Sequence, residues 1–168
     1  RIGLSMQKLI VKRSASFLFG NEVKLSAETT TANHEKILNA VKEILKHTKI
    51  KSINRRMAKI LLSCTEVAEV WYPVDNATEK NLYGIESKFT LRVQLLNPMK
   101  GDKLYPYFDE FGDLIAFSRE YEVKVSDTKQ THFEIYTDKA FYVYDITDNP
   151  VIVEGYPKIN EIGKIPIV

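Results

Sequence analysis

The sequence predicts an α+β fold in which about three N-terminal helices are followed by an antiparallel β-sheet meander. Apolar residues recur at three- and four-residue steps up to residue 64, as they do on one face of a helix. In residues 65–168, apolar and polar residues instead alternate in short runs bounded by turn residues, which is typical of strands. The connections between these strands are too short for a parallel return, which needs roughly a dozen residues. We expect a single α+β domain over residues 1–168.

The helices are predicted from their apolar stripes and end signals. The first covers residues 2–19 and ends at Gly20, which tolerates the positive φ of a helix C-terminus, and a short extended piece follows at residues 23–25. The second begins near Asn33, a plausible N-cap, and its last turn carries basic residues. The third covers about Ile50 to Leu62.

The predicted strands follow Cys64 and are separated by Pro, Asn, Asp and Gly. They cover Val67–Tyr72, Phe89–Leu95, Leu114–Val125, His132–Tyr136, Phe141–Asp145 and Val151–Glu154. Phe89, Leu91, Val93 and Leu95 alternate with polar residues, which predicts a half-buried strand.

Composition is that of an ordinary globular domain, because 168 residues contain 44% hydrophobic and 27% charged residues. A chain this long needs no metal or disulfide to fold. No apolar stretch approaches the roughly 20 residues of a membrane span, and no signal peptide is visible, so we expect a cytosolic or particle-bound protein without a membrane partner. Because the chain opens at Arg1 and closes on the strand-like run Ile165–Val168, we interpret it as a fragment of a longer chain.

Charge is unevenly distributed along the chain. Residues 1–64 hold 13 basic and 4 acidic residues, a net charge of +9, whereas residues 65–168 hold 11 and 18, a net charge of −7. Such asymmetry marks surfaces with different partners or two halves that attract each other.

Catalytic and cofactor chemistry finds little support. The seven glycines form no phosphate-binding loop. Zinc requires clustered ligands, yet the thiol and imidazoles are scattered, at Cys64, His34, His47 and His132. Cys64 is interpreted as a buried structural thiol, and we expect no metal, no cofactor and no enzyme.

Two acidic patterns have alternative interpretations. Glu122-x-Lys124 resembles half of the motif of restriction-type, metal-dependent nucleases, but the upstream Pro73-Val74-Asp75 is off by one residue. Alternating charges on the solvent face of a strand explain the same residues. The acidic cluster Asp109, Glu110 and Asp113 around Gly112 is interpreted as a turn rather than a cation site, because turns select Asp and Gly.

A basic face is predicted on the third helix and the residues before it. It contains Lys46, Lys49, Lys51, Arg55, Arg56 and Lys59. A solvated face, a subunit contact and a DNA contact are all compatible with this pattern. Lys46, Arg55, Arg56 and Lys59 are our candidates for a subunit interface.

Several short stretches follow one another along the chain in an order that resembles a known family. They are Ala15–Gly20 followed by Asn21-Glu22-Val23, then Asn54–Arg56 and Ser63–Tyr72, and finally Leu91–Val93, Leu114–Tyr121, Phe133–Thr137 and Gly163–Val168. As an ordered set, they resemble the portal proteins of tailed bacteriophages and prophages. The likeness covers most of the chain and is closest to the outer wing region of the portal.

The resemblance implies a structural role. Portals of this family are virion rings of about twelve subunits at one capsid vertex, assembled in the bacterial host cytoplasm, through which duplex DNA is packaged and ejected. It implies as partners the terminase motor, capsid or scaffold proteins and the head-to-tail adaptor, and it brings no catalytic residues. The rival interpretations are a metal-dependent nuclease-like domain and a binding module of another phage structural protein.

Overall fold

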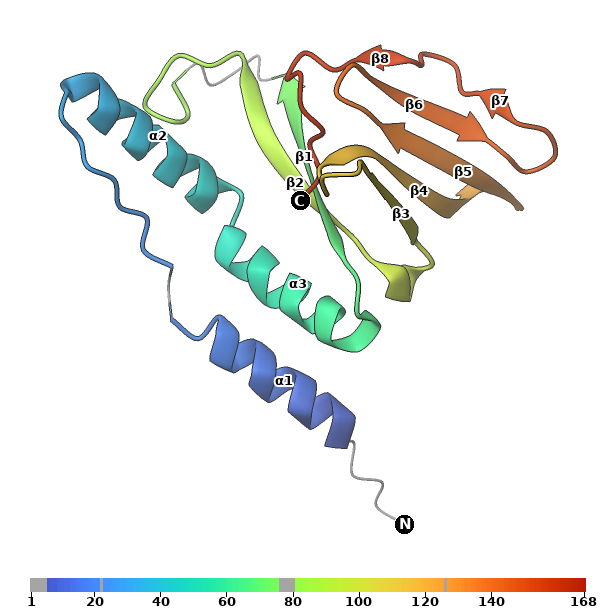
Figure 1. Cartoon of the computed structure of the whole chain (residues 1–168), viewed down its shortest axis with the longest axis horizontal. Helices are drawn as coiled ribbons and strands as arrows, with labels where there is room; N and C mark the ends of the chain where they lie inside the picture. Colours follow the sequence, from blue (N-terminus) through green and yellow to red (C-terminus); the bar gives the residue numbers. More distant parts are fainter. Residues whose placement is uncertain (1–5, 22, 76–80, 126) are drawn as a thin grey trace. The chain divides into compact units, whose positions relative to one another are not determined.

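The computed structural model describes residues 6–21, 23–75, 81–125 and 127–168. The chain forms two compact units. Residues 1–66 and 71–95 make up the first, the helical unit, and residues 67–70 and 96–168 make up the second, the sheet unit. Three helices precede antiparallel sheets along the chain, so the predicted α+β class is confirmed (Figure 1).

The helical unit contains α1 (Met6–Leu18), α2 (Ala32–His47) and α3 (Ile50–Cys64). Both α1 and α2 contact α3, and α1 runs beside α3 in the opposite direction (Figure 1). The buried side chains of the three helices are mostly small or β-branched: Ala15, Ala40, Ile53, Ala58 and Ile60. Small residues at these positions let the helices approach closely. No helix among the described residues is both long and apolar enough to cross a membrane.

The start of α2 differs from the prediction. Thr31, not Asn33, is the N-cap, and its hydroxyl oxygen accepts a hydrogen bond from the backbone N–H of His34 at 3.3 Å. Asn33 already lies inside the helix, because threonine two residues earlier has the extended backbone that a cap requires. Residues 23–30 form no regular strand.

A two-residue turn joins α2 to α3. The Thr48 N–H donates to the carbonyl of Ile44 at 2.9 Å, which closes α2, and Lys49 adopts a left-handed backbone with φ 54°. The Lys49 carbonyl then accepts from the N–H of Ser52 at 2.8 Å and starts α3. The predicted third helix is confirmed and extends to Cys64, which is half-buried rather than the buried thiol we expected.

Two strands follow the helices and form a two-stranded sheet, β1 (Ala68–Asp75) and β2 (Phe89–Leu96). The predicted alternation of β2 is confirmed from Leu91 to Leu95, but Phe89 is exposed and Thr90 is buried. Tyr83, which precedes β2, is buried, and its hydroxyl oxygen accepts from the Leu91 N–H at 3.0 Å.

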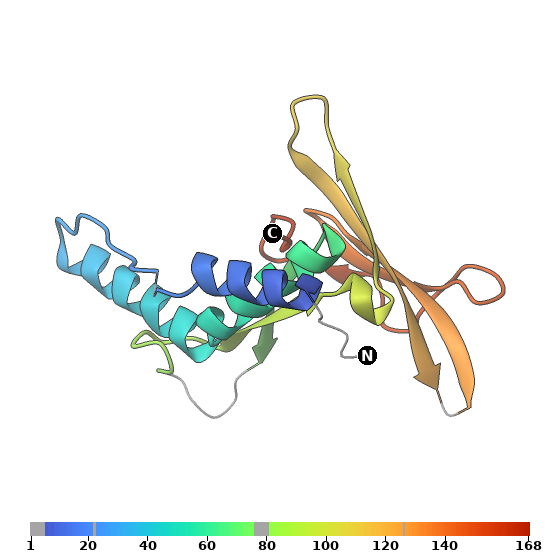
Figure 2. The same ribbon diagram turned by 90° about the horizontal axis from the view of Figure 1, so that it is seen from below.

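The larger sheet belongs to the sheet unit and is antiparallel throughout. Its strands are β3 (Lys103–Phe108), β4 (Leu114–Val125), β5 (Thr128–Tyr136), β6 (Ala140–Asp145), β7 (Val151–Ile152) and β8 (Lys158–Ile159). They pair in the order β3-β4-β5-β6-β7. The short strand β7 pairs with the last residues of β6, and β8 pairs with its first residues. A short helix, η1 (Pro98–Lys100), precedes β3. Figure 2 shows the β3–β4 hairpin, in yellow and gold, as a long projection of the sheet.

Two of these strands were not predicted. β3 contains Pro106, which discourages a strand assignment, but β3 is an edge strand, where proline is tolerated. β8 pairs over only two residues, too few for a recognisable alternation. β5 also begins four residues before the predicted His132, and β7 ends at Ile152 rather than Glu154.

The core of the sheet unit joins residues from distant parts of the chain. It contains Ala68, Val70, Leu96, Phe117 and Ile167, with Leu96 completely buried. The backbones of Glu69 and Val168 exchange two hydrogen bonds of 2.8 and 2.9 Å, so the first residues of β1 pair with the end of the chain. Residues 67–70 therefore complete the core of the sheet unit.

A left-handed backbone at the C-cap of α3 gives a stability prediction. Thr65 has φ 67°, which is unfavourable for a β-branched residue and unstrained for glycine. We expect Thr65→Gly to raise the free energy of unfolding by about 1 kcal/mol, measured by urea titration. Thr65→Ala keeps a Cβ and is the control, which should show no such gain. An equal gain for both variants would contradict the strain.

Candidate functional site

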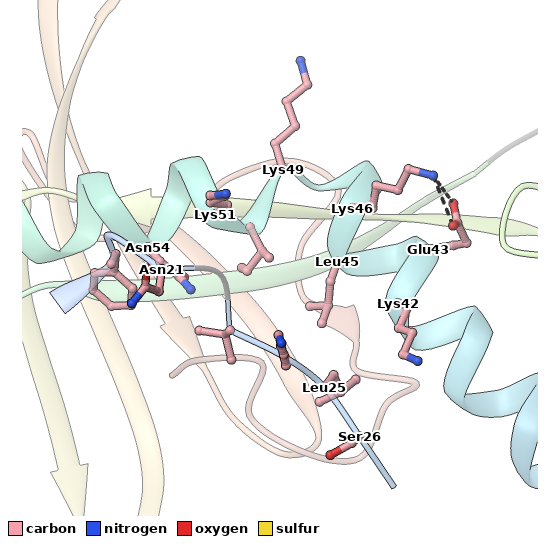
Figure 3. Close-up of a pocket in the computed structure, with 14 residues that line it drawn as sticks. Asn21, Leu25, Ser26, Lys42, Glu43, Leu45, Lys46, Lys49, Lys51 and Asn54 are labelled. Carbon is pink, nitrogen blue, oxygen red and sulfur yellow. Dashed lines mark hydrogen bonds and ion pairs between the residues drawn. The ribbon is translucent and has the colours of Figure 1, made fainter. Parts of the chain in front are cut away.

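A groove lies in the helical unit and is lined by residues from three of its segments. Residues 21 and 23–26 run alongside the α2–α3 junction, and the groove lies between this segment and the two helices (Figure 3). Its volume is about 820 Å³. Apolar side chains of the extended segment, of α2 and of α3 line the groove, together with Phe19, which precedes the segment. They are Phe19, Val23, Leu25, Leu45 and Ile50.

The groove is strongly basic. Among the residues that the structure describes, five lysines line it against a single carboxylate, Glu43: Lys24, Lys42, Lys46, Lys49 and Lys51. Lys42 and Leu45 point toward the extended segment, whereas Lys49 extends away from it (Figure 3). The Lys46 ammonium donates to the Glu43 carboxylate at 3.2 Å, with both side chains largely exposed. An apolar surface bordered by ammonium groups suits an occupant that is both apolar and acidic.

The predicted interface residues fall in two places within the helical unit. Lys46 lines the groove, whereas Arg55, Arg56 and Lys59 lie on the exposed side of α3. Arg55 also has a local partner, because its Nε donates to the backbone carbonyl of Phe19 at 3.2 Å. A cation at the carbonyl end of a helix is favourable, so Arg55 stabilises the end of α1 against α3.

A second candidate is a largely buried polar cluster on the sheet unit, which we call the Arg119 cluster. It comprises Asp102, Arg119, Tyr121, Glu134 and Tyr136. Arg119 donates to Asp102 Oδ1 through Nε and Nη2 at 3.1 and 2.9 Å, and to Glu134 through Nη1 at 3.4 Å. Both tyrosine hydroxyls donate to Glu134 at 2.8 Å, and the guanidinium lies 4.0 Å from the centre of the Tyr121 ring. The backbone N–H of Asn97 donates to the other oxygen of Asp102 at 2.6 Å.

The Arg119 cluster has a structural character. Burial raises the pKa of Tyr121 and Tyr136, and the neighbouring Glu134 carboxylate adds to this effect. Perturbed groups often mark catalytic sites. Here, however, the arginine is shared between two carboxylates, and each hydroxyl is already donating to one of them. The cluster joins β4 and β5 to the turn before β3, and it offers no unoccupied base or nucleophile.

The residues of the nuclease half-motif lie on a solvent-exposed face. Glu122 and Lys124 are exposed on β4, and the Lys129 ammonium donates to Glu122 at 2.7 Å from the adjacent strand. This hydrogen bond lowers the pKa of Glu122. Among the described residues, no group of three His, Cys, Asp or Glu side chains could hold a metal ion. The arrangement is the alternating charge pattern of a strand surface.

The acidic residues around Gly112 form the tip of the β3–β4 hairpin, so the predicted turn is confirmed. Asp109 Oδ1 accepts from the backbone N–H groups of Phe111 and Asp113, both at 2.9 Å. Gly112 has φ 88°, which a residue with a side chain rarely adopts. Phe111 projects from this turn and is 84% exposed.

Sequence reasoning missed both the groove and the Arg119 cluster. The groove depends on residues 21 and 23–26 lying beside the α2–α3 junction, and so short a segment carries no periodic signal. The cluster collects residues from β4, β5 and the turn before β3, and only strand register brings them together. A partial signal existed in the alternation of Phe117, Arg119 and Tyr121, which places these side chains on one face of β4.

The whole chain, residues 1–168, matches the family model described as phage portal protein, SPP1 Gp6-like. A comparison with curated proteins gives no match.

Removing the central cation of the Arg119 cluster should destabilise the sheet unit. Arg119→Met leaves Asp102 and Glu134, which are 8% and 15% exposed, without their counter-ion. Breaking a buried ion pair in this way costs about 3 kcal/mol. Urea unfolding followed by the near-ultraviolet circular dichroism of the tyrosines measures the loss. Lys129→Met removes an exposed pair and should change the midpoint far less, and equal effects would contradict the role of burial.

The raised pKa values of Tyr121 and Tyr136 predict that the folded state loses stability at alkaline pH. Their pKa values are raised above the ordinary value of 10.0, so the folded state holds its phenolic protons where the unfolded chain releases them. Stability is therefore fully present below about pH 10 and falls as the pH rises beyond it. The double variant Tyr121→Phe/Tyr136→Phe should reduce this slope between about pH 10 and pH 12. Tyr107→Phe, whose side chain is exposed, should keep it; a slope unchanged in the double variant would refute the assignment.

Proposed function

Because the chain belongs to the phage portal protein family, a family of structural rather than enzymatic proteins, we propose that it is part of a ring-forming portal subunit at the capsid vertex. Duplex DNA passes through this ring during packaging and ejection. The match of the family model to all 168 residues is the observation that carries the proposal. The structural character of the Arg119 cluster agrees with it.

The proposed assembly contains about twelve copies related by rotation, which makes each contact between neighbours heterologous. The terminase motor supplies the energy for packaging, capsid or scaffold proteins surround the ring, and a head-to-tail adaptor joins it later. Assembly takes place in the cytoplasm of the bacterial host, and the mature location is the virion.

The surface of the helical unit supports an assembly role. Several large apolar side chains of α1 are exposed, including Ile10 at 60%, Phe17 at 91% and Leu18 at 60%. Exposed apolar side chains gathered on one element are typical of protein–protein contact surfaces.

The basic candidates provide the charged part of the proposed contact. Lys46, Arg55, Arg56 and Lys59 present positive charge, and the acidic sheet unit of a neighbouring copy is the complementary partner. Because Arg55 also holds the Phe19 carbonyl, its substitution would mix a folding effect with an assembly effect. Arg56 and Lys59 are therefore the better residues to test.

Negative-stain electron microscopy of the full-length protein that contains this chain tests the proposal. We expect closed rings with a central channel wide enough for duplex DNA. Arg56→Glu/Lys59→Glu should reduce the yield of rings and change its dependence on salt, because exposed charge pairs are screened. Lys36→Glu/Lys88→Glu makes the same charge change at exposed positions elsewhere on the helical unit and is the control.

Two results would overturn the proposal. Monomers or open polymers of the unmodified protein across salt and pH would contradict a ring. Magnesium-dependent cleavage of DNA that is lost in Glu122→Ala would instead establish the nuclease interpretation. Rings that are insensitive to the Arg56 and Lys59 reversals would contradict the assigned interface residues alone.

A further inference from the structure

We propose that the basic groove of the helical unit receives the tip of the β3–β4 hairpin from a neighbouring copy of the chain. This inference rests on the proposed ring, and it names the two surfaces that meet in it. The tip consists of residues 107–113, and the groove is the one formed by residues 21 and 23–26 and the α2–α3 junction.

The tip has the composition that the groove requires. Tyr107 and Phe108 at the end of β3 and Phe111 in the turn that follows are 64%, 53% and 84% exposed, which is unusual for three aromatic side chains so close together. Asp109, Glu110 and Asp113 give the same turn three carboxylates. An apolar and acidic projection thus exists on the same chain as an apolar and basic groove, and the two surfaces have complementary charge.

The tip is also held in a defined shape. In addition to the two hydrogen bonds accepted by Asp109 Oδ1, the Asp109 N–H donates to the Asp113 carbonyl at 2.9 Å. The Gly112 N–H donates to the Asp109 carbonyl at 3.2 Å. These bonds fix the backbone around Phe111, so little conformational entropy is lost when the tip is bound.

A second copy fits the groove better than nucleic acid does. Phosphate contacts require cations, but they make no use of an apolar lining. The groove instead combines lysines with Phe19, Val23, Leu25, Leu45 and Ile50, which matches the aromatic part of the tip. A heterologous ring also requires two unlike surfaces on each copy, and these two surfaces meet that condition.

Chemical cross-linking of the full-length protein tests the contact directly. Ser26 lines the groove and Glu110 lies on the tip, so Ser26→Cys/Glu110→Cys in a Cys64→Ser background places one thiol on each surface. A short bismaleimide should then produce a ladder of covalent oligomers in denaturing gels. The control pair Ser26→Cys/Asp138→Cys moves the second thiol to the β5–β6 turn and should leave monomers.

Charge exchange tests the same contact independently. Lys42→Glu/Lys51→Glu reverses two groove lysines and should lower ring yield about tenfold at low salt. Adding Glu110→Lys/Asp113→Lys should restore the yield, because it restores opposite signs across the contact. Asp109 stays unchanged because it holds the turn together.

The apolar part of the contact is tested separately. Phe111→Ser should lower ring yield, whereas Ile162→Ser, which also removes an exposed apolar side chain, should not.

The outcomes separate this inference from the ring itself. Rings that form normally but give no ladder, or the same ladder with the control pair, would overturn the inference and leave the ring standing. Loss of assembly in the lysine reversals without rescue by the tip reversals would also overturn it and would point to DNA or another acidic partner in the groove. Absence of rings in the unmodified protein would contradict the proposed function and this inference together.

Discussion

The sheet unit depends on the pairing of residues 67–70 with the end of the chain. The two hydrogen bonds between Glu69 and Val168 place Val70 beside Ile167, and both side chains contribute to the core with Phe117. This pairing joins segments that are far apart in sequence, so its loop-closure entropy is large and must be offset by the apolar surface buried around it. Without residues 67–70, the core would lose Ala68 and Val70 and would expose Leu96, its most buried side chain.

The same core determines how β4 presents its other residues. Phe117 is fixed in the core, and because side chains alternate along a strand, Arg119 and Tyr121 follow on the same face. Their bonds to Asp102 and Glu134 connect β4 to the turn before β3 and to β5. The β3–β4 hairpin is thereby held at its base, and its tip is held by Asp109. A projection fixed at both places can present Phe111 in a constant position.

Local signals explain which parts of this structure the sequence predicts. The apolar spacing of α3 and the alternation and turn residues around β4 act over a few residues, so both elements are predicted within two residues of their ends. Thr31 and Asn33 are both good caps, and only the backbone of the preceding segment decides between them. The groove and the Arg119 cluster depend on contacts between distant residues, for which a single sequence holds no direct signal. For the same reason, the basic residues could be identified in the sequence, but the hydrogen bond from Arg55 to Phe19 could not.

A heterologous ring sets a requirement that differs from folding, because each copy must offer two unlike surfaces that do not compete for the same residues. In this chain the positive residues concentrate in the helical unit and the negative excess lies in residues 65–168. The groove and the hairpin tip thus belong to units with separate cores. Substitutions that alter the charge of one surface leave the packing of the other unit intact, so affinity between copies can change without a change in either fold. Because every copy carries both surfaces, a small gain at one contact is repeated around a closed ring, which makes assembly more sensitive to these residues than the stability of a single chain is.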